Sequence, residues 1–290
     1  MSFIEKYMPS MSEDPLAKYR PFPAEPTSVF AAHWHELVGS FIFYVIIQAL
    51  SDPIFSRIMG TRYTSLPKKV KINFDIHVVS MVQCFVSISV LVPHLFNSHY
   101  LNRVEDPVGS LKGTTPFGGM VCALTVGYFV WDVYVCTKYY SIFGLGFLFH
   151  GFAAMYAYSC GFIPYCQPWA GPFLVFELST PFVNINWFAS KLPAGTFSEK
   201  TIIINGLLLI ATFFTVRILW GFAMIYKLAT DMFNTWHLVP WFVPSSMLVL
   251  NFFLNCLNVF WFSKMVMIAK KKAAGRETTL QAAREADKIE

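Results

Sequence analysis

Seven long apolar runs constrain this chain more than any other feature of its sequence. They cover about 36–59, 73–96, 119–137, 142–160, 168–190, 201–226 and 241–267. Each approaches or exceeds the ~20 residues that a helix needs to cross a bilayer. Lipid offers no partners to backbone polar groups, so such runs must fold as helices. The sequence therefore predicts an all-α fold, a polytopic membrane bundle of about seven transmembrane helices.

Composition excludes a soluble protein. Apolar residues make up 55% of the chain and charged residues only 13%, whereas soluble domains are about 25% charged. The net charge of +5 is modest and falls mostly at the ends of the apolar runs. We interpret it as a topology signal, and it predicts no nucleic-acid partner.

Basic residues mark the two segments expected in the cytosol. One segment follows the first run and the other follows the last run. The positive-inside rule places both in the cytosol, so seven crossings leave the N-terminus outside or in a lumen and the C-terminus cytosolic. The basic residues are Arg57, Arg62, Lys68, Lys69 and Lys71 in the first segment, and Lys264, Lys270, Lys271, Lys272 and Arg276 in the second.

The same patterns divide the chain into four parts. A proline-rich arm, 1–32, is expected to be extended, and a first transmembrane helix with its basic loop spans 33–64. The main transmembrane domain is expected at 65–270 and a charged cytosolic tail at 271–290. Within the first helix, proline at position 53 predicts a kink or an end near Asp52–Pro53.

Three successive apolar runs each carry an ionisable residue: Asp132, His150 and Glu177. A charge in hydrocarbon costs about 2.5–3.5 kcal/mol on insertion scales, so these side chains should turn toward a common interior or a wet cavity. We expect His150 to lie within one side-chain layer of Asp132 or Glu177. His150 would act as base or nucleophile, and a carboxylate would orient it.

Other polar residues inside the runs are candidate binding groups. Arg217 should turn inward and meet a carboxylate or several carbonyls. Three asparagines at spacings i, i+4 and i+7 share one helical face, either as contacts between helices or as donors to a ligand. The candidate substrate-binding residues are Trp131, Asn184, Arg217, Asn251, Asn255 and His77, and the third asparagine of the stripe is Asn258.

The sequence predicts no metal site. It contains no CxxC motif, and His33 and His35 are two residues apart and therefore do not share a helical face. Cys160 and Cys166 flank a short loop on the expected outer side, where a disulfide is permitted but left open.

Several motifs together resemble the signature of the TLC domain. They are GYFVWD at 127–132, then His150, then ELSTPFVN at 177–184 and Asn186–Trp187. The resemblance covers about residues 65–270 and is nearest to the TLC-domain-containing proteins, within a family that also includes the ceramide synthases and translocating-chain-associating membrane protein. Ceramide synthases carry paired histidines where this chain has Phe149–His150, so a single histidine carries over.

The resemblance implies an endoplasmic-reticulum membrane protein of lipid homeostasis, with helices around a central lipid-accessible cavity. It implies a membrane lipid or acyl chain as partner and no resident cofactor. Acyl-CoA would be the co-substrate if the protein transfers acyl groups.

Three functions stay open at this stage. The first is lipid binding in an intramembrane cavity, with or without acyl transfer, and the second is a ceramide-synthase-like N-acyltransferase that uses His150. The third is a small-molecule transporter, which ranks last because no internal repeat or pair of broken helices is visible in the sequence.

Overall fold

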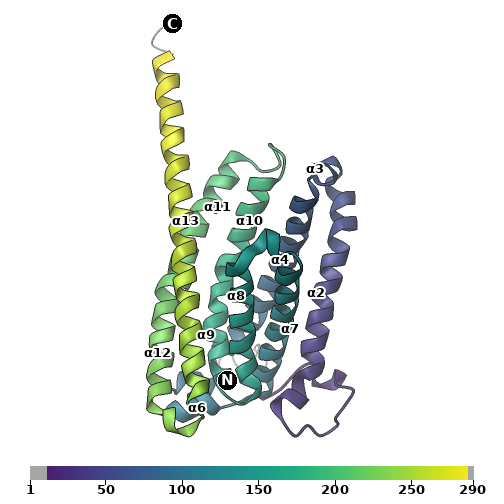
Figure 1. Ribbon diagram of the computed structural model, residues 1–290, viewed down its shortest axis with the longest axis vertical. Coiled ribbons are helices and arrows are strands. Elements are labelled where there is room, and N and C mark those ends of the chain that lie inside the picture. Colours follow the sequence, from purple (N-terminus) through teal and green to yellow (C-terminus); the bar gives the residue numbers. More distant parts are fainter. Residues whose placement is uncertain (1–11, 287–290) are drawn as a thin grey trace, which may run out of the picture.

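The computed structural model describes the backbone of residues 12–286 and their side chains except at 272, 273 and 276–286. The described chain folds into helices and turns without a strand, which confirms the all-α expectation. Figure 1 shows the long helices running side by side, with α13 extending beyond the upper end of the bundle.

Six continuous helical segments are long and apolar enough to cross a membrane. Most begin or end within a few residues of the expected boundaries. They are α2 (Val29–Met59), α4 (Lys68–His94), α7 (Pro116–Lys138), α8 (Tyr140–Ser159) with η2 (Cys160–Phe162), α11 (Glu199–Phe213) with η5 (Phe214–Leu219) and α12 (Trp220–Asn234), and α13 (Phe242–Ala286), whose apolar part ends at Lys271.

The remaining expected run, 168–190, is not one of these six, and it runs along the bundle as a segmented crossing rather than as one regular helix. It comprises α9 (Ala170–Leu174), the 3₁₀ stretch η4 (Val175–Ser179) and α10 (Thr180–Lys191). Pro181 lies in the first turn of α10, where it cannot donate to the carbonyl of Glu177. The missing hydrogen bond is consistent with the change here from the 3₁₀ stretch η4 to the α-helix α10. Figure 1 shows α9 in the lower half of the bundle and α10 in the upper half.

Short helices fill the connections. Figure 1 places α3 at the upper end and α6 at the lower end of the bundle. The short elements are η1 (Ala17–Tyr19), α3 (Thr61–Thr64), α5 (Ser98–Leu101), α6 (Pro107–Lys112), η3 (Gln167–Trp169) and η6 (Trp236–Leu238).

The first transmembrane helix begins earlier than the sequence indicated and does not end at Pro53. Ser28 caps it by accepting a hydrogen bond from the Ala31 amide at 3.1 Å. The helix also continues through Pro53 to Met59. Contacts to α4 hold it on both sides of the proline: Ser51 donates to Asp75 at 2.7 Å, and the rings of Phe55 and Phe74 lie 4.9 Å apart. Tertiary packing thus outweighs the local preference for a break.

Helix α7 lies at the centre of the helix packing and is the most buried of the six long segments. It packs against α2 on one side and α8 on the other. Gly127 faces the backbone of α2 so closely that a Cβ would collide with the Leu37 carbonyl. Ser40 of α2 donates to the Leu124 carbonyl at 2.7 Å. Small residues that admit a neighbouring backbone are typical of helix contacts in membranes.

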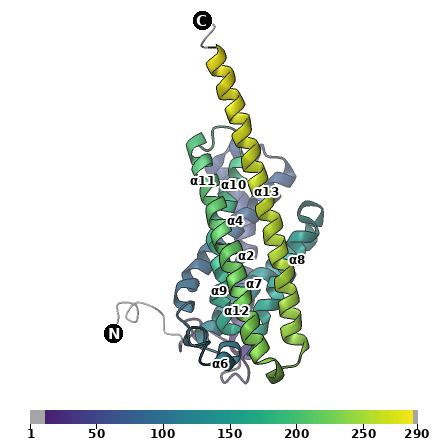
Figure 2. The same ribbon diagram turned by 90° about the vertical axis from the view of Figure 1, so that its left-hand side faces the viewer.

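Helix α8 bends near its start. Gly144 has a φ of 71°, a left-handed conformation that glycine adopts without steric cost. Figure 2 shows the left-hand side of Figure 1, where α13 runs beside α8 and the α11–α12 segment.

Candidate functional site: a pocket within the bundle

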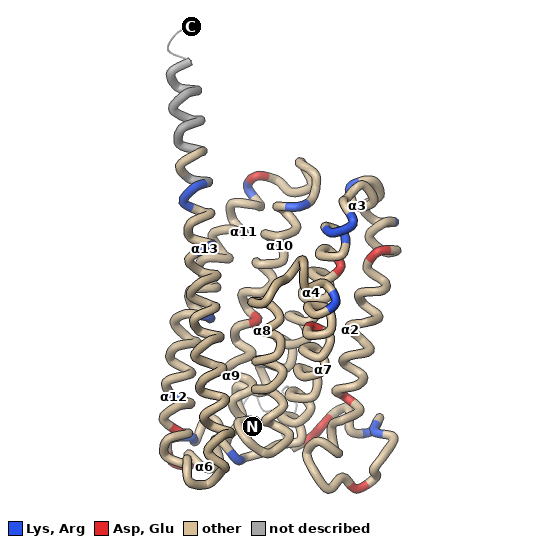
Figure 3. Tube along the Cα trace, viewed as in Figure 1, with Lys and Arg blue, Asp and Glu red and all other residues tan. Residues whose placement is uncertain are grey.

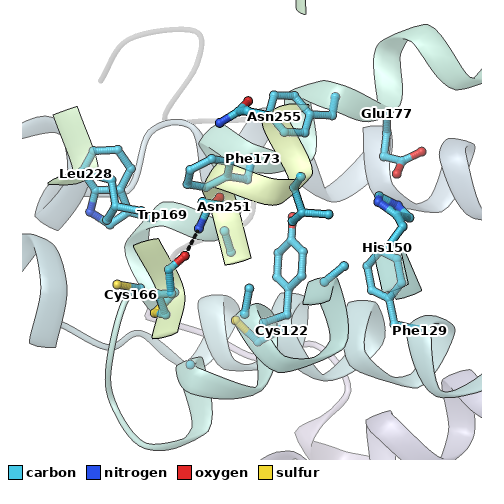
Figure 4. Close-up of a pocket in the computed structure, with 18 of the residues that line it drawn as sticks. Cys122, Phe129, His150, Cys166, Trp169, Phe173, Glu177, Leu228, Asn251 and Asn255 are labelled. Carbon is cyan, nitrogen blue, oxygen red and sulfur yellow. Dashed lines mark hydrogen bonds between the residues drawn. The ribbon is translucent and has the colours of Figure 1, made fainter. Parts of the chain in front are cut away.

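An elongated pocket lies between α7, α8, the segmented crossing, the α11–α12 segment and α13. Its cavity volume is about 90 Å³, within about 910 Å³ of space free of protein atoms that includes the open surroundings. Figure 4 shows Trp169 and Leu228 at one end of the pocket and His150 and Glu177 at the other. The pocket therefore extends from the middle of α8 toward the loop that follows it.

Most of the pocket wall is apolar. Aromatic rings line its length, together with small residues of α8 that leave room for a ligand. These apolar lining residues include Phe129, Ala154, Ala157, Tyr158, Trp169, Phe173, Phe176, Leu228 and Leu254. A wall of this kind suits a hydrocarbon chain.

His150 and Glu177 both present their side chains to this space. Figure 4 shows them pointing toward one another from α8 and η4. The His150 ring meets Phe129 and Trp261 edge-on, with centroid distances of 6.0 and 5.7 Å. Within residues 12–286, neither the imidazole nor the Glu177 carboxylate meets a hydrogen-bond partner. Both groups are therefore available to a ligand.

Arg217 also lines the pocket and lies on the π-helical turn η5, the kind of irregularity that is frequent at functional sites. Its side chain turns inward, as the sequence predicts. The partners differ from the expected carboxylate or carbonyls. Nε donates to the Ser179 hydroxyl at 3.0 Å and one terminal nitrogen donates to the Thr180 hydroxyl at 3.4 Å. The guanidinium also lies 5.3 Å from the centroid of the Phe213 ring.

The asparagine stripe of α13 faces the same pocket. Asn251, Asn255 and Asn258 are all buried and all line it. Asn251 donates to the Met247 carbonyl of its own helix at 2.9 Å, the hydrogen bond drawn in Figure 4. The stripe thus places amide groups opposite the fifth crossing, inside the bundle.

Two other predicted site residues lie outside the pocket lining. The Asp132 carboxylate packs against Gly151, the neighbour of His150 on α8, and accepts a weak hydrogen bond from the Cys136 thiol at 3.7 Å. Trp131 is fully buried and donates from its indole nitrogen to Gln48 of α2 at 3.0 Å. Neither side chain is part of the pocket lining.

His77 and Asn184 form a separate polar contact between α4 and α10. The His77 Nδ1 donates to the Asn184 amide oxygen at 2.7 Å, and the Asn184 amide nitrogen donates to Ser80 at 3.1 Å. Trp187 stacks on the imidazole at a centroid distance of 4.3 Å. This cluster joins two helices, and none of its residues lines the pocket.

Sequence reasoning named no site residue among the aromatic residues that form the wall of the pocket. Tyr158, Trp169 and Phe173 carry no distinguishing signal in a chain with 30 phenylalanines and many other aromatic residues. Cys160 and Cys166, where a disulfide was left open, are both buried free thiols.

Comparison with known proteins identifies the family. The family model for the TLC domain matches residues 73–267, which include every residue that lines the pocket. The chain belongs to the TLC domain family. The domain contains His150, Glu177 and Arg217, and it excludes α2 and the arm before it.

Relatives of this TLC domain protein share most of its length. Topoisomerase I damage affected protein 4 of Saccharomyces cerevisiae is 37% identical over 270 residues, covering 91% of this chain and 94% of its own. A TLC domain-containing protein of Schizosaccharomyces pombe is 39% identical over 251 residues, covering 86% and 83%. Human TLC domain-containing protein 4 is 29% identical over 218 residues, covering 73% and 79%. No solved structure matches the chain significantly.

Proposed function

We propose that the protein binds a membrane lipid by enclosing one acyl chain in the pocket, and that it thereby acts in lipid homeostasis. The observation that carries this proposal is the division of the pocket into an apolar length and a polar end. The aromatic wall extends from Trp169, and His150 and Glu177 lie at the opposite end (Figure 4). A lipid with one apolar chain and one polar linkage matches this division, because its chain suits the apolar length and its linkage suits the polar end.

The polar end suits an ester or amide linkage. Arg217 supplies hydrogen-bond donors, and Glu177 supplies an acceptor. Ionisable groups at this depth are costly and are typically retained for function. A lipid that hydrogen bonds to His150 and Glu177 would give partners to two side chains that have none within the described protein.

Lipid extraction and native mass spectrometry of the detergent-purified protein test this proposal. Ala157→Phe places a ring in the pocket wall and should remove the co-purified lipid. Leu207→Phe is the matched control because it adds a ring at a position that is 66% exposed on the outside of the bundle. Equal lipid occupancy in the two folded variants would contradict the proposal.

Acyl transfer is a second candidate function, favoured by the orientation of His150 toward Glu177. In the proposed step, His150 takes a proton from the amine or hydroxyl of an acceptor lipid. The acceptor attacks the thioester carbonyl of acyl-CoA, a C–N or C–O bond forms and the C–S bond breaks. The imidazolium, stabilised by Glu177, then returns the proton to the departing thiolate. The proposal gives Asp132 no contact with ligand, because its carboxylate is outside the pocket lining.

A pair of assays separates transfer from binding. His150→Ala should abolish the transfer of a labelled acyl group while the variant still co-purifies with lipid. Loss of transfer with retained binding supports catalysis. Transfer at the wild-type rate in His150→Ala would remove His150 from the mechanism, and absence of transfer in wild type with several amine and hydroxyl acceptors would leave binding as the function.

We also propose the endoplasmic reticulum membrane as the location, with the upper end of the bundle in Figure 1 facing the cytosol. Figure 3 shows many basic residues at that end, around α3, the end of α10 and the upper part of α13. The positive-inside rule supports this orientation. Glycosylation tags should be modified at the N-terminus and unmodified at the C-terminus, and the reverse pattern would contradict it.

A further inference from the structure

A second cluster of ionisable residues lies outside the pocket and outside the matched domain, where the arm before α2 folds against the start of that helix. It consists of Asp14 from the arm and His33 and Glu36 from α2. The His33 Nδ1 lies 3.4 Å from Asp14 Oδ2 and 2.9 Å from Glu36 Oε2. One ligand atom from each residue falls within 4.8 Å of the others. Figure 3 shows acidic positions meeting at the lower end of α2.

The cluster is buried, and two of its carboxylate oxygens lack hydrogen-bond partners. The side chains of Asp14, His33 and Glu36 are only 4%, 6% and 1% exposed. Asp14 Oδ2 and Glu36 Oε1 are buried oxygens without a hydrogen-bond partner. Two carboxylates enclosed together are strongly unfavourable unless a cation or a proton neutralises them. These orphaned oxygens point to a missing partner.

The arginine of the arm, Arg20, hydrogen bonds to backbone carbonyls. Arg20 donates to the backbone carbonyls of Pro23 at 3.0 Å, Ala32 at 3.1 Å and Ala24 at 3.4 Å. It makes no ion pair with Asp14 or Glu36 within the described part of the chain. Arg20 therefore shapes the arm, and the basic groups that face the two carboxylates are His33 and His35, whose Nε2 lies 3.6 Å from Glu36 Oε1.

Local structure holds each of the three residues in place. His33 and Glu36 are three residues apart on α2 and so share a helical face. The Oδ1 of Asp14 accepts a hydrogen bond from the Leu16 amide at 2.8 Å, which leaves Oδ2 free to face His33. His35 donates to the Leu16 carbonyl at 3.1 Å and fastens the same turn of the arm. Gly119 of α7 makes room for the His33 ring, because a Cβ there would collide with it.

We propose that Asp14, His33 and Glu36 bind a divalent transition-metal ion of the zinc class. The ligands would be the His33 Nδ1, Asp14 Oδ2 and a carboxylate oxygen of Glu36. Two carboxylates and one neutral imidazole balance a doubly charged ion. One nitrogen and two carboxylate oxygens are typical zinc ligands, whereas calcium and magnesium favour oxygen alone. The proposal is independent of the function proposed for the pocket.

In this proposal the ion fastens the arm to the bundle. Asp14 is separated from His33 by a stretch that includes η1 and the turn around Pro23, and a shared ion closes that loop against α2 and α7. The expectation of no metal rested on the absence of a CxxC motif and on the pair His33 and His35, which do not share a face. The structure instead joins His33 to Glu36 and to a residue of the arm.

Metal content and stability of the full-length protein in detergent test the proposal. Wild type purified without chelator should carry about one zinc ion per chain, as a single three-ligand site would hold. Zinc should raise the melting temperature after chelator treatment. Asp14→Asn and Glu36→Gln should lose both effects. Glu13→Gln and His237→Ala, at exposed positions, are the matched controls and should keep them.

Limited proteolysis supplies a second readout that does not depend on the variants. Lys18 lies exposed in the arm, so trypsin should cut after it faster once the ion is removed, and added zinc should restore protection. Wild type that binds no zinc and shows no zinc-dependent change in melting or cleavage would overturn the proposal. Zinc binding that persists in both Asp14→Asn and Glu36→Gln would overturn it equally.

Discussion

Arg217 donates a hydrogen bond from Nε to the Ser179 hydroxyl across 3.0 Å, and this contact joins two departures from regular helix. Arg217 lies on the π-helical turn η5, and Ser179 ends the 3₁₀ stretch η4. Irregular backbone at membrane depth is tolerated where protein or a cavity surrounds it. The two irregular segments face each other beside the pocket and satisfy each other's polar groups.

Replacing Arg217 by methionine should destabilise the protein by about 1.5–3 kcal/mol, the range for hydrogen bonds to a charged group. The variant removes the donor to Ser179 and Thr180 and leaves Glu177 without its nearby cation. Thermal unfolding followed by tryptophan fluorescence measures the change. Lys200→Met, at an exposed position of α11, is the control and should melt like wild type.

Gly127→Ala should destabilise by about 1–3 kcal/mol, as overpacking does at tight contacts. The added methyl group would collide with the Leu37 carbonyl of α2, which cannot move without shifting the helix. Gly206→Ala is the comparison, because a Cβ there meets no atom within 4 Å. Its stability should be unchanged or increased by up to ~1 kcal/mol through helix propensity. Equal losses at the two glycines would contradict this account of the α2–α7 contact.

The His77–Asn184 pair should couple α4 to α10. A double-mutant cycle with His77→Ala and Asn184→Ala should give a coupling energy of about 0.6–1.7 kcal/mol, the range for hydrogen bonds between membrane helices. The stacking of Trp187 on the imidazole adds a contribution that only the His77 variant loses. Strictly additive effects of the two substitutions would show that the hydrogen bond contributes nothing.

His150→Ala should leave the fold nearly as stable as wild type in the absence of ligand. The imidazole has aromatic neighbours but no hydrogen-bond partner in the described chain, so the loss should be about 0.5–1.5 kcal/mol. Added lipid should stabilise wild type more than the variant. A variant that fails to fold would show that His150 supports the structure rather than the ligand.

The segmented fifth crossing shows where sequence patterns reach their limit. Length and apolarity predict a helix at 168–190, and Pro181 predicts a weakened bond to the Glu177 carbonyl. Neither pattern predicts a 3₁₀ stretch that turns Glu177 toward His150. Arg217 contacts the end of this stretch through Ser179 and Thr180, from which it is far apart in the sequence.

The sequence by itself determined the class of fold, because a bilayer leaves helices as the only way for apolar runs to satisfy their backbone. It also predicted the shared face of Asn251, Asn255 and Asn258 and the inward turn of Arg217, since helical period and the cost of charge in lipid are local properties. Only the tertiary structure decided that His150 and Glu177 line the pocket while Asp132 and Trp131 do not. It alone brought Asp14 to His33 and Glu36, because contacts between distant segments depend on how the helices pack and on where the arm can fold against them.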